Sequence, residues 1–259
     1  MSECVPVTMT LERGLQVLRA FRAERAALTN GELARMTGLS RATVSRLTTT
    51  LIHAGFIRRV AGGRQFELAS GAFGIGQAFL ATNPVAHRAH PVMQRMADRL
   101  DVSIALAVPD HLDMLYIAHC ASARIATLRM GVGKLLPMGV TAIGRAWLWG
   151  LPGDERHRYV QLLADAAGPR AGQMKTGIAA AFEDLRQSGV CMSFGEYQRN
   201  VYGIALPVRI GRTGTLMSLS CGGAELQPDI AAIRDRVIPM LKAAAVELTE
   251  RLSEVRYDL

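Results

Sequence analysis

The chain has 259 residues, of which 49% are hydrophobic and 20% are charged. This composition provides enough apolar material for one large or two ordinary folded domains and excludes a disordered chain. Its longest apolar runs are far shorter than the ~20 residues of a membrane helix, and its first residues do not form a basic segment followed by an apolar one, so we expect a cytoplasmic protein with no membrane partner.

The basic residues are unevenly distributed and are almost all arginine. The formal net charge is +8, from 30 basic and 22 acidic residues, and only Lys134, Lys175 and Lys242 are lysines. Residues 1–82 carry ten Arg and five acidic residues, whereas the remaining chain carries 20 basic and 17 acidic residues. Because the planar guanidinium group matches phosphates and guanine edges, this bias predicts a polyanion-binding module in the first third of the chain.

Cysteine and histidine spacing argues against a metal or disulfide framework. The four cysteines are scattered, without a CxxC pair: Cys4, Cys120, Cys191 and Cys221. His87 and His90 are spaced to share a helix face, but no third ligand lies nearby in the sequence. We therefore expect reduced thiols, three of them in or near the core, no metal site and no cofactor.

The first 55 residues show three short helical patterns. Apolar residues at helical spacing predict a first helix that ends near residues 24–26. Thr29 and Glu32 have the spacing of a capping box, which predicts the start of a second helix, and Gly38 marks the turn after it. Ser40 is a natural N-cap for a third helix. The apolar face of that third helix comprises Val44, Leu47 and Leu51.

The next segment changes from helical to strand periodicity. Residues 56–60 and 64–68 predict two strands joined by a Gly-Gly hairpin at Gly62 and Gly63. Helix, helix, turn, helix and hairpin together predict a winged helix-turn-helix over residues 1–69. The apolar segment over 70–82 predicts a linker helix before Asn83 and Pro84.

Residues 83–259 mix helical and strand patterns irregularly. Helices are predicted at about 85–100, 142–149, 154–163, 175–187 and 228–255, with a break at Pro239. Strands are predicted at about 102–108, 114–119, 124–130, 202–210 and 215–221. This order predicts an α+β domain with a mainly antiparallel sheet.

Several segments, taken in order, carry a resemblance to a known family. They are residues 11–18 (LERGLQVL), 32–47 (ELARMTGLSRATVSRL), 55–57 (GFI), 136–146 (LPMGVTAIGRA), 205–208 (ALPV) and 218–220 (SLS). In this order they resemble the IclR family of bacterial transcriptional regulators. The resemblance implies an N-terminal winged helix and a C-terminal GAF-like effector-binding and oligomerisation domain over 83–259. It also implies a dimer or tetramer.

A winged helix-turn-helix places its recognition helix in the major groove of double-stranded DNA and contacts bases from the first turns of that helix. The candidate residues on the helix are Ser40, Arg41, Thr43, Ser45 and Arg46. The candidates around the hairpin, for phosphates or the minor groove, are Arg58, Arg59 and Arg64. Arg46 is best suited to a bidentate contact with guanine. A dimer would bind a pseudo-palindromic operator with half-sites about one helical turn, or a multiple, apart.

The resemblance also implies a set of positions lining an effector pocket. These are Leu128, Ala142, Ile143, Ser193, Val201, Gly203, Ser220 and Gly222. Ser193 stands where some family members have an acidic side chain, and Gly203 and Gly222 stand where others have larger or polar ones. Hydroxyl groups and backbone N–H groups near the two glycines suggest that the ligand is a small, and by hypothesis aromatic, organic acid.

Two other functions remain open from the sequence. The C-terminal domain could serve only to assemble subunits, or it could be an enzyme that depends on one of its cysteines. We expect no enzyme, because His119 and Cys120 are strand neighbours whose side chains point to opposite faces. The segment 131–134 (GVGK) lacks the spacing of a phosphate-binding loop.

Overall fold

The computed structural model describes residues 7–125, 130–224 and 229–257. Residue contacts divide the chain into two compact units, Met1–Thr82 and Asn83–Leu259. The linker helix therefore groups with the first unit. Among the described residues, no helix is long and apolar enough to cross a membrane.

The first unit contains the three predicted helices, α1 (Met9–Arg19), α2 (Asn30–Thr37) and α3 (Arg41–His53). The capping box at the start of α2 is present: the Thr29 hydroxyl accepts from the Glu32 amide at 3.2 Å, and the Glu32 carboxylate accepts from the Thr29 amide at 2.7 Å. Gly38 ends α2 in the left-handed conformation, with φ of 69°. The local sequence thus determines both ends of α2.

The prediction that the first helix reaches residues 24–26 was wrong. It ends at Arg19, and the chain reverses through a turn closed by the Arg25 amide bonding to the Arg22 carbonyl oxygen at 2.8 Å. The reversal delivers β1 (Ala27–Thr29) to the edge of the wing, where it pairs with β3 (Gln65–Leu68). The three-stranded wing has the order β1-β3-β2, with β2 spanning Ile57–Arg59.

The linker helix α4 (Ser70–Thr82) begins against the turn that precedes the wing. Gly55 has a φ of 76°, and its carbonyl oxygen accepts from the Gly71 amide at 3.2 Å. A Cβ atom at Gly71 would lie 2.6 Å from that oxygen, so this contact requires glycine on the helix. The start of α4 is therefore attached closely to the wing.

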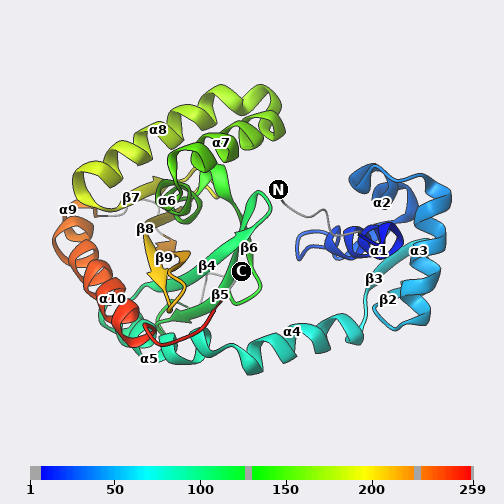
Figure 1. Ribbon diagram of the computed structural model, residues 1–259, viewed down its shortest axis with the longest axis horizontal. Coiled ribbons are helices and arrows are strands. Elements are labelled where there is room, and N and C mark those ends of the chain that lie inside the picture. Colours follow the sequence, from blue (N-terminus) through cyan, green and yellow to red (C-terminus); the bar gives the residue numbers. More distant parts are fainter. Residues whose placement is uncertain (1–6, 126–129, 225–228, 258–259) are drawn as a thin grey trace. The chain divides into compact units, whose positions relative to one another are not determined.

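The second unit is built on a six-stranded sheet (Figure 1), and its antiparallel pairing confirms the mainly antiparallel arrangement that the sequence predicts. Its strand order is β6-β5-β4-β9-β8-β7. The strands are β4 (Ser103–Asp110), β5 (Asp113–Ala121), β6 (Leu135–Pro137), β7 (Cys191–Phe194), β8 (Val201–Ile210) and β9 (Thr215–Ala224). The short strands β6 and β7 were not predicted. The strand predicted at 124–130 falls largely outside the described residues, and Arg124, Ile125 and Met130 are not in a strand.

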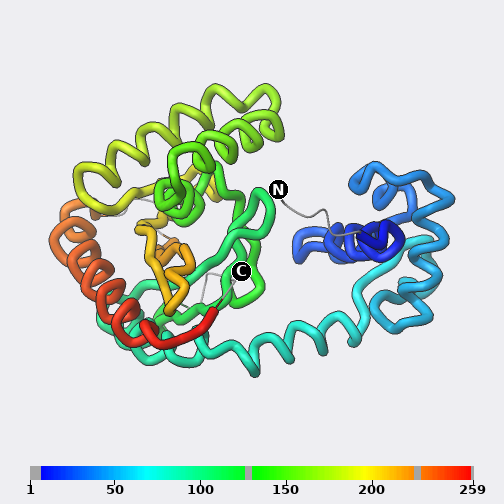
Figure 2. The backbone as a smooth tube through the Cα atoms, viewed as in Figure 1, coloured from blue at the N-terminus to red at the C-terminus, as the bar shows by residue number. Residues whose placement is uncertain are grey.

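Helices cover the two faces of this sheet in separate groups (Figure 2). One face packs on α5 (Pro84–Leu100) and α10 (Ile238–Arg251), and the other lies beneath α6 (Ala142–Gly150), α7 (Gly153–Ala167) and α8 (Ala171–Ser188). Each face has its own buried cluster of apolar side chains. A short 3-10 turn over Met138–Val140 connects β6 to α6.

The last helical segment contains the break predicted at Pro239. After one short turn, α9 (Ile230–Ala232), residues Ile233–Val237 form a π-helix, and α10 follows. Because Pro239 has no N–H group, the regular ladder cannot continue through it, and the wider turn precedes it. The helix ends at Arg251, four residues before the predicted end, and the chain then turns.

The Gly55–Gly71 contact gives a stability prediction. Gly71→Ala forces a methyl group against a backbone oxygen, and we expect it to destabilise the first unit by about 1–3 kcal/mol. Gly74, one turn later in α4, has no atom within 4 Å of the position that a Cβ would take, so Gly74→Ala should be neutral or stabilise by up to ~1 kcal/mol. Urea unfolding of the full chain measures both. Equal effects of the two substitutions would contradict the contact.

Candidate functional site

The third helix exposes the side that the sequence assigned to recognition. The Ser40 hydroxyl accepts from the Thr43 amide at 3.2 Å and caps α3 as predicted. Val44, Leu47 and Thr48 are buried, whereas Arg41, Ala42, Ser45, Arg46 and Thr49 are exposed and Thr43 is half-buried. The N-terminal turns of α3 therefore present two guanidinium groups and two hydroxyl groups to solvent.

The three wing arginines lie in different environments. Arg58 pairs with Glu67 across the hairpin at 2.9 Å, and the Arg59 guanidinium lies over the Phe66 ring at 5.1 Å from its centre. Arg64 is exposed in the connecting turn. Glu67 partly neutralises Arg58. The positive charge that the wing offers a phosphate therefore comes mostly from Arg59 and Arg64.

The second unit encloses a cavity between its sheet and the start of α6. On the face beneath α6 the central strands carry small side chains, including Ala105, Ala205 and Ser220, which lie side by side in the strand register. On the opposite face the same strands carry Ile104, Leu206 and similar residues. Ala105 and Ala205 are packed beneath α6 in a buried apolar cluster, and Ser220 lines the cavity, so the small residues let α6 approach this face of the sheet closely.

Helix α6, whose N-terminus borders the cavity, is fixed at both ends. The Thr141 hydroxyl caps its N-terminus, accepting from the Gly144 amide at 3.4 Å and donating to the Pro137 carbonyl oxygen at 2.7 Å. At its C-terminus, Arg156 donates to the carbonyl oxygens of Trp149 and Leu151. As the first two helical residues, Ala142 and Ile143 have amides without an intrahelical acceptor, and both residues line the cavity.

The cavity brings together seven of the eight predicted effector positions. Ala142, Ile143, Ser193, Val201, Gly203, Ser220 and Gly222 all line it, and Leu128 lies outside the described residues. Sequence reasoning missed the other lining residues, which are Ser103, Tyr116, Met130, Leu136, Thr141, Tyr197, Tyr202, Cys221 and Gly223. Tyr116 lies on a predicted strand. Because side chains alternate between the two faces of a sheet, its place in that strand could have indicated that it lines a cavity.

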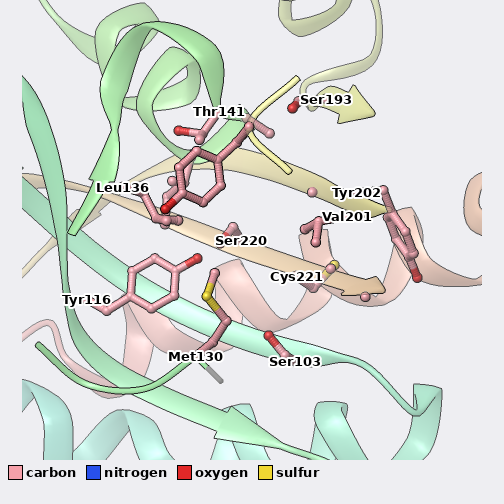
Figure 3. Close-up of a pocket in the computed structure, with 16 residues that line it drawn as sticks. Ser103, Tyr116, Met130, Leu136, Thr141, Ser193, Val201, Tyr202, Ser220 and Cys221 are labelled. Carbon is pink, nitrogen blue, oxygen red and sulfur yellow. The ribbon is translucent and has the colours of Figure 1, made fainter. Parts of the chain in front are cut away.

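The cavity wall is rich in hydroxyl groups. Seven lining residues carry one, and none of the described lining residues is Asp, Glu, Lys, Arg or His. The Tyr116 hydroxyl points toward Ser220, with which its side chain is hydrogen-bonded (Figure 3). Burial raises the pKa of Tyr116 to about 12, so its phenol is protonated at neutral pH. An acidic ligand here would meet neutral hydrogen-bond donors.

The expected role of the Gly203 and Gly222 backbone amides was wrong. The two glycines pair with each other in the register of β8 and β9, and Gly203 also pairs with Ser193. Backbone N–H groups of paired strands lie in the plane of the sheet and face neighbouring strands. The candidate donors to an anion are instead the Ala142 and Ile143 amides at the start of α6, which have no intrahelical acceptor. What Gly203 contributes is space: a Cβ atom there would only touch the Ala142 Cβ, at 3.7 Å.

Three of the four cysteines, Cys120, Cys191 and Cys221, are buried in the second unit. Burial raises the pKa of Cys191 and of Cys221 to about 12 and that of Cys120 to about 11, which makes all three poor nucleophiles at neutral pH. His119 stacks near Tyr116, whereas Cys120 belongs to the cluster on the other face of the sheet. Within the described segments, no group of three His, Cys, Asp or Glu residues could hold a metal ion.

Comparison with known proteins assigns both halves of the chain. Residues 10–61 match the IclR helix-turn-helix domain, and residues 77–250 match the family described as bacterial transcriptional regulator IclR C-terminal. The chain belongs to the IclR family. Its exposed third helix and wing are those of a helix-turn-helix transcriptional regulator.

Similar bacterial proteins cover nearly the whole chain. The Pca regulon regulatory protein of Pseudomonas putida is 27% identical, over 94% of this chain and 84% of that protein. A crystal structure of an IclR family regulator from Brucella abortus is 30% identical, with a TM-score of 0.87 over 96% of this chain and 95% of its own. An IclR homologue from Microbacterium hydrocarbonoxydans, crystallised with 4-hydroxybenzoate, shares the fold at 20% identity, with a TM-score of 0.65 over 94% and 98%.

Proposed function

We propose that this IclR-family regulator binds a pseudo-palindromic operator through α3 and the wing, and that a small aromatic acid in the cavity beneath α6 controls its affinity for DNA. The observation that carries the proposal is the cavity itself. It gathers seven predicted effector positions against two free helix N-terminal amides.

The DNA-reading part rests on exposure and charge. Arg41, Ser45 and Arg46 are solvent-exposed on the first turns of α3, where a recognition helix reaches base edges in the major groove. Arg46 would bind guanine through two hydrogen bonds, and Arg41, Ser40, Thr43 and Ser45 would contact neighbouring bases or phosphates. Arg59 and Arg64, with Arg58, would hold the wing on the backbone.

Arg46→Ala should therefore weaken operator binding by about 1–3 kcal/mol, or roughly 5- to 150-fold, with little change on random DNA. Arg64→Ala, the matched control, should weaken both by a similar factor and lower the salt dependence by about one phosphate contact. Fluorescence anisotropy at several salt concentrations separates the two. An equal loss on operator and random DNA for Arg46→Ala would make it a phosphate contact.

The effector class follows from the donors around the cavity. A carboxylate would accept hydrogen bonds from the Ala142 and Ile143 amides and the Ser193 hydroxyl, with support from the positive end of the α6 dipole. The Tyr116 ring, the Met130 side chain and other apolar parts of the lining offer a surface for an aromatic ring. The 4-hydroxybenzoate complex of the Microbacterium homologue supports this class.

Filling the cavity tests this assignment. Gly203→Leu places a side chain beside Ala142, and we expect it to weaken binding of 4-hydroxybenzoate or benzoate at least tenfold while leaving operator binding intact. Gly172→Leu is the control, because Gly172 is exposed on α8 with no atom within 4 Å of a Cβ position. Calorimetric titration measures both. Unchanged acid binding by Gly203→Leu would place the ligand elsewhere.

A panel of acids tests the alternative function. If no acid in it changes the melting temperature or the operator affinity of the parent protein, the C-terminal domain serves assembly only. Such a result would leave the DNA-binding role intact, since that role depends on α3 and the wing.

Self-association is supported by exposed apolar side chains in the first unit. Leu11 and Leu15 on α1 are 63% and 51% exposed, and Phe73 and Ile75 on α4 are 68% and 62% exposed. Exposed apolar side chains of this size favour protein contacts, and a second copy would supply the second half-site reader of a palindromic operator.

We therefore expect the 28.0 kDa chain to sediment as a dimer or tetramer. Phe73→Ser combined with Ile75→Ser should shift it toward smaller species and weaken operator binding more than it weakens acid binding. Analytical ultracentrifugation measures the mass. A parent protein that sediments as a monomer at micromolar concentration would contradict the proposal.

A further inference from the structure

A second, larger cavity adjoins the one beneath α6. The inner cavity, described above, has a volume of about 60 Å³, and the outer cavity has about 500 Å³. The outer cavity is lined by the turn over Met138–Val140 together with α7 and α8. Its walls are mostly apolar, with Leu163 and Met174 buried and Arg170 exposed at one side.

The two cavities share a wall that the chain crosses twice between β6 and α6. Leu136 lines the inner cavity and Pro137 the outer one, and Thr141 lines the inner cavity while Val140 lines the outer one. Tyr197, in the loop between β7 and β8, is the one described residue common to both linings. Its half-buried ring packs against the apolar cluster beneath α6. Tyr197 therefore stands at the boundary between them.

An ion pair between a buried arginine and an exposed glutamate holds the Tyr197 loop in place. The Arg145 side chain is 2% exposed and binds Glu196, next to Tyr197, through both terminal nitrogens, at 2.7 and 2.5 Å. Its Nε also donates to the Gly139 carbonyl oxygen at 3.1 Å. One guanidinium thus joins α6, the turn that lines the outer cavity, and the loop that carries Tyr197. Bidentate charge-assisted bonds of this kind restrict geometry strongly.

The surrounding packing is shaped for this arginine. A Cβ atom at Gly177 on α8 would lie 2.3 Å from the Arg145 Nη2 atom, so a larger residue there would displace the guanidinium from its position. The other described residues of the loop, such as Gln198 and Arg199, are exposed. The buried Arg145 guanidinium therefore anchors a solvent-facing loop through its exposed Glu196.

We infer that the Tyr197 ring is a partition that separates the inner from the outer cavity and so limits the length of acid the effector site admits. The inference rests on the proposed effector function and deepens it. With the ring in place, the inner cavity has a volume of only about 60 Å³, so any acid longer than a single ring is excluded from it. Without the ring, the two cavities join, and a longer acid can extend from the α6 N-terminus toward Leu163 and Met174. Arg145 acts through Glu196 as a positioning residue.

A thiol in the inner cavity tests the partition without any effector. Gly203→Cys, in a Cys4→Ser chain, places a sulfur in the inner cavity near Ala142. Its rate of modification by methyl methanethiosulfonate is measured by mass spectrometry of the peptide that contains position 203. We expect Tyr197→Ala to raise this rate at least tenfold, because the reagent then enters from the outer cavity.

Two matched variants control for general loosening of the loop. Tyr197→Phe keeps the ring, and Gln198→Ala changes an exposed neighbour that lines neither cavity. Both should stay within twofold of the parent rate. A rate for Tyr197→Ala within twofold of the parent, or an equal rise in all three variants, would overturn the inference.

Acid binding provides the second readout. The parent should prefer 4-hydroxybenzoate to biphenyl-4-carboxylate, and Tyr197→Ala should shift the ratio of their affinities at least tenfold toward the longer acid. An unchanged ratio would overturn the inference. If neither acid binds any variant, the proposed effector class fails, but the modification rates at position 203 still decide the role of Tyr197.

Discussion

The arrangement of small and large side chains on the two faces of one antiparallel sheet is the constraint on which the second unit depends. Ile104 and Leu206 fill the face toward α5 and α10, while Ala105, Ala205 and Ser220 let α6 approach the opposite face, where the cavity lies beside Ser220. A protein interior is close-packed, so a hollow persists only where the covering elements are held away from it. Here α6 is fixed at both ends by hydrogen bonds, and the cavity lies at its N-terminus.

The chemistry of the cavity follows from this construction. The described lining contains hydroxyl groups and helix N-terminal amides but no charged side chain, so recognition of an acid would use neutral donors and the helix dipole. Neutral donors cost less to bury than a cation when the site is empty. A domain with such a cavity can stay folded without ligand. A sensor that alternates between free and bound states needs this property. For the ligand to change operator affinity, it must bind more tightly to one arrangement of the protein than to another.

Features that depend on neighbouring residues could be predicted from the sequence, and those that depend on distant pairing could not. The Thr29–Glu32 capping box, the Ser40 cap and the break at Pro239 involve residues a few positions apart, and all are present. The strands β1, β6 and β7 have three or four residues each, too few for a periodic pattern. They exist because a distant strand offers them a partner. The first helix was predicted too long for the same reason. The chain has to turn after Arg19 so that β1 can pair with β3.

The candidate sites divide in the same way. The exposed face of α3 could be read from helical spacing, and the resemblance to the IclR family led to seven wall positions of the cavity. No local signal marks Tyr197, which reaches the wall because Glu196 is held by Arg145, 51 positions away along the chain. Tyr116 carries a weak signal through strand alternation. Burial and long-range ion pairs place both tyrosines at the cavity wall, and these features become visible only in the folded chain.

The central claim is that an acid in the cavity changes how α3 and the wing bind DNA. The most direct test is to titrate the purified protein against DNA from its own promoter region at several salt concentrations, with and without a panel of small aromatic acids. The account predicts tight, salt-sensitive binding that one acid weakens or strengthens at least tenfold. Equal affinity for promoter and random DNA, unmoved by every acid, would contradict it.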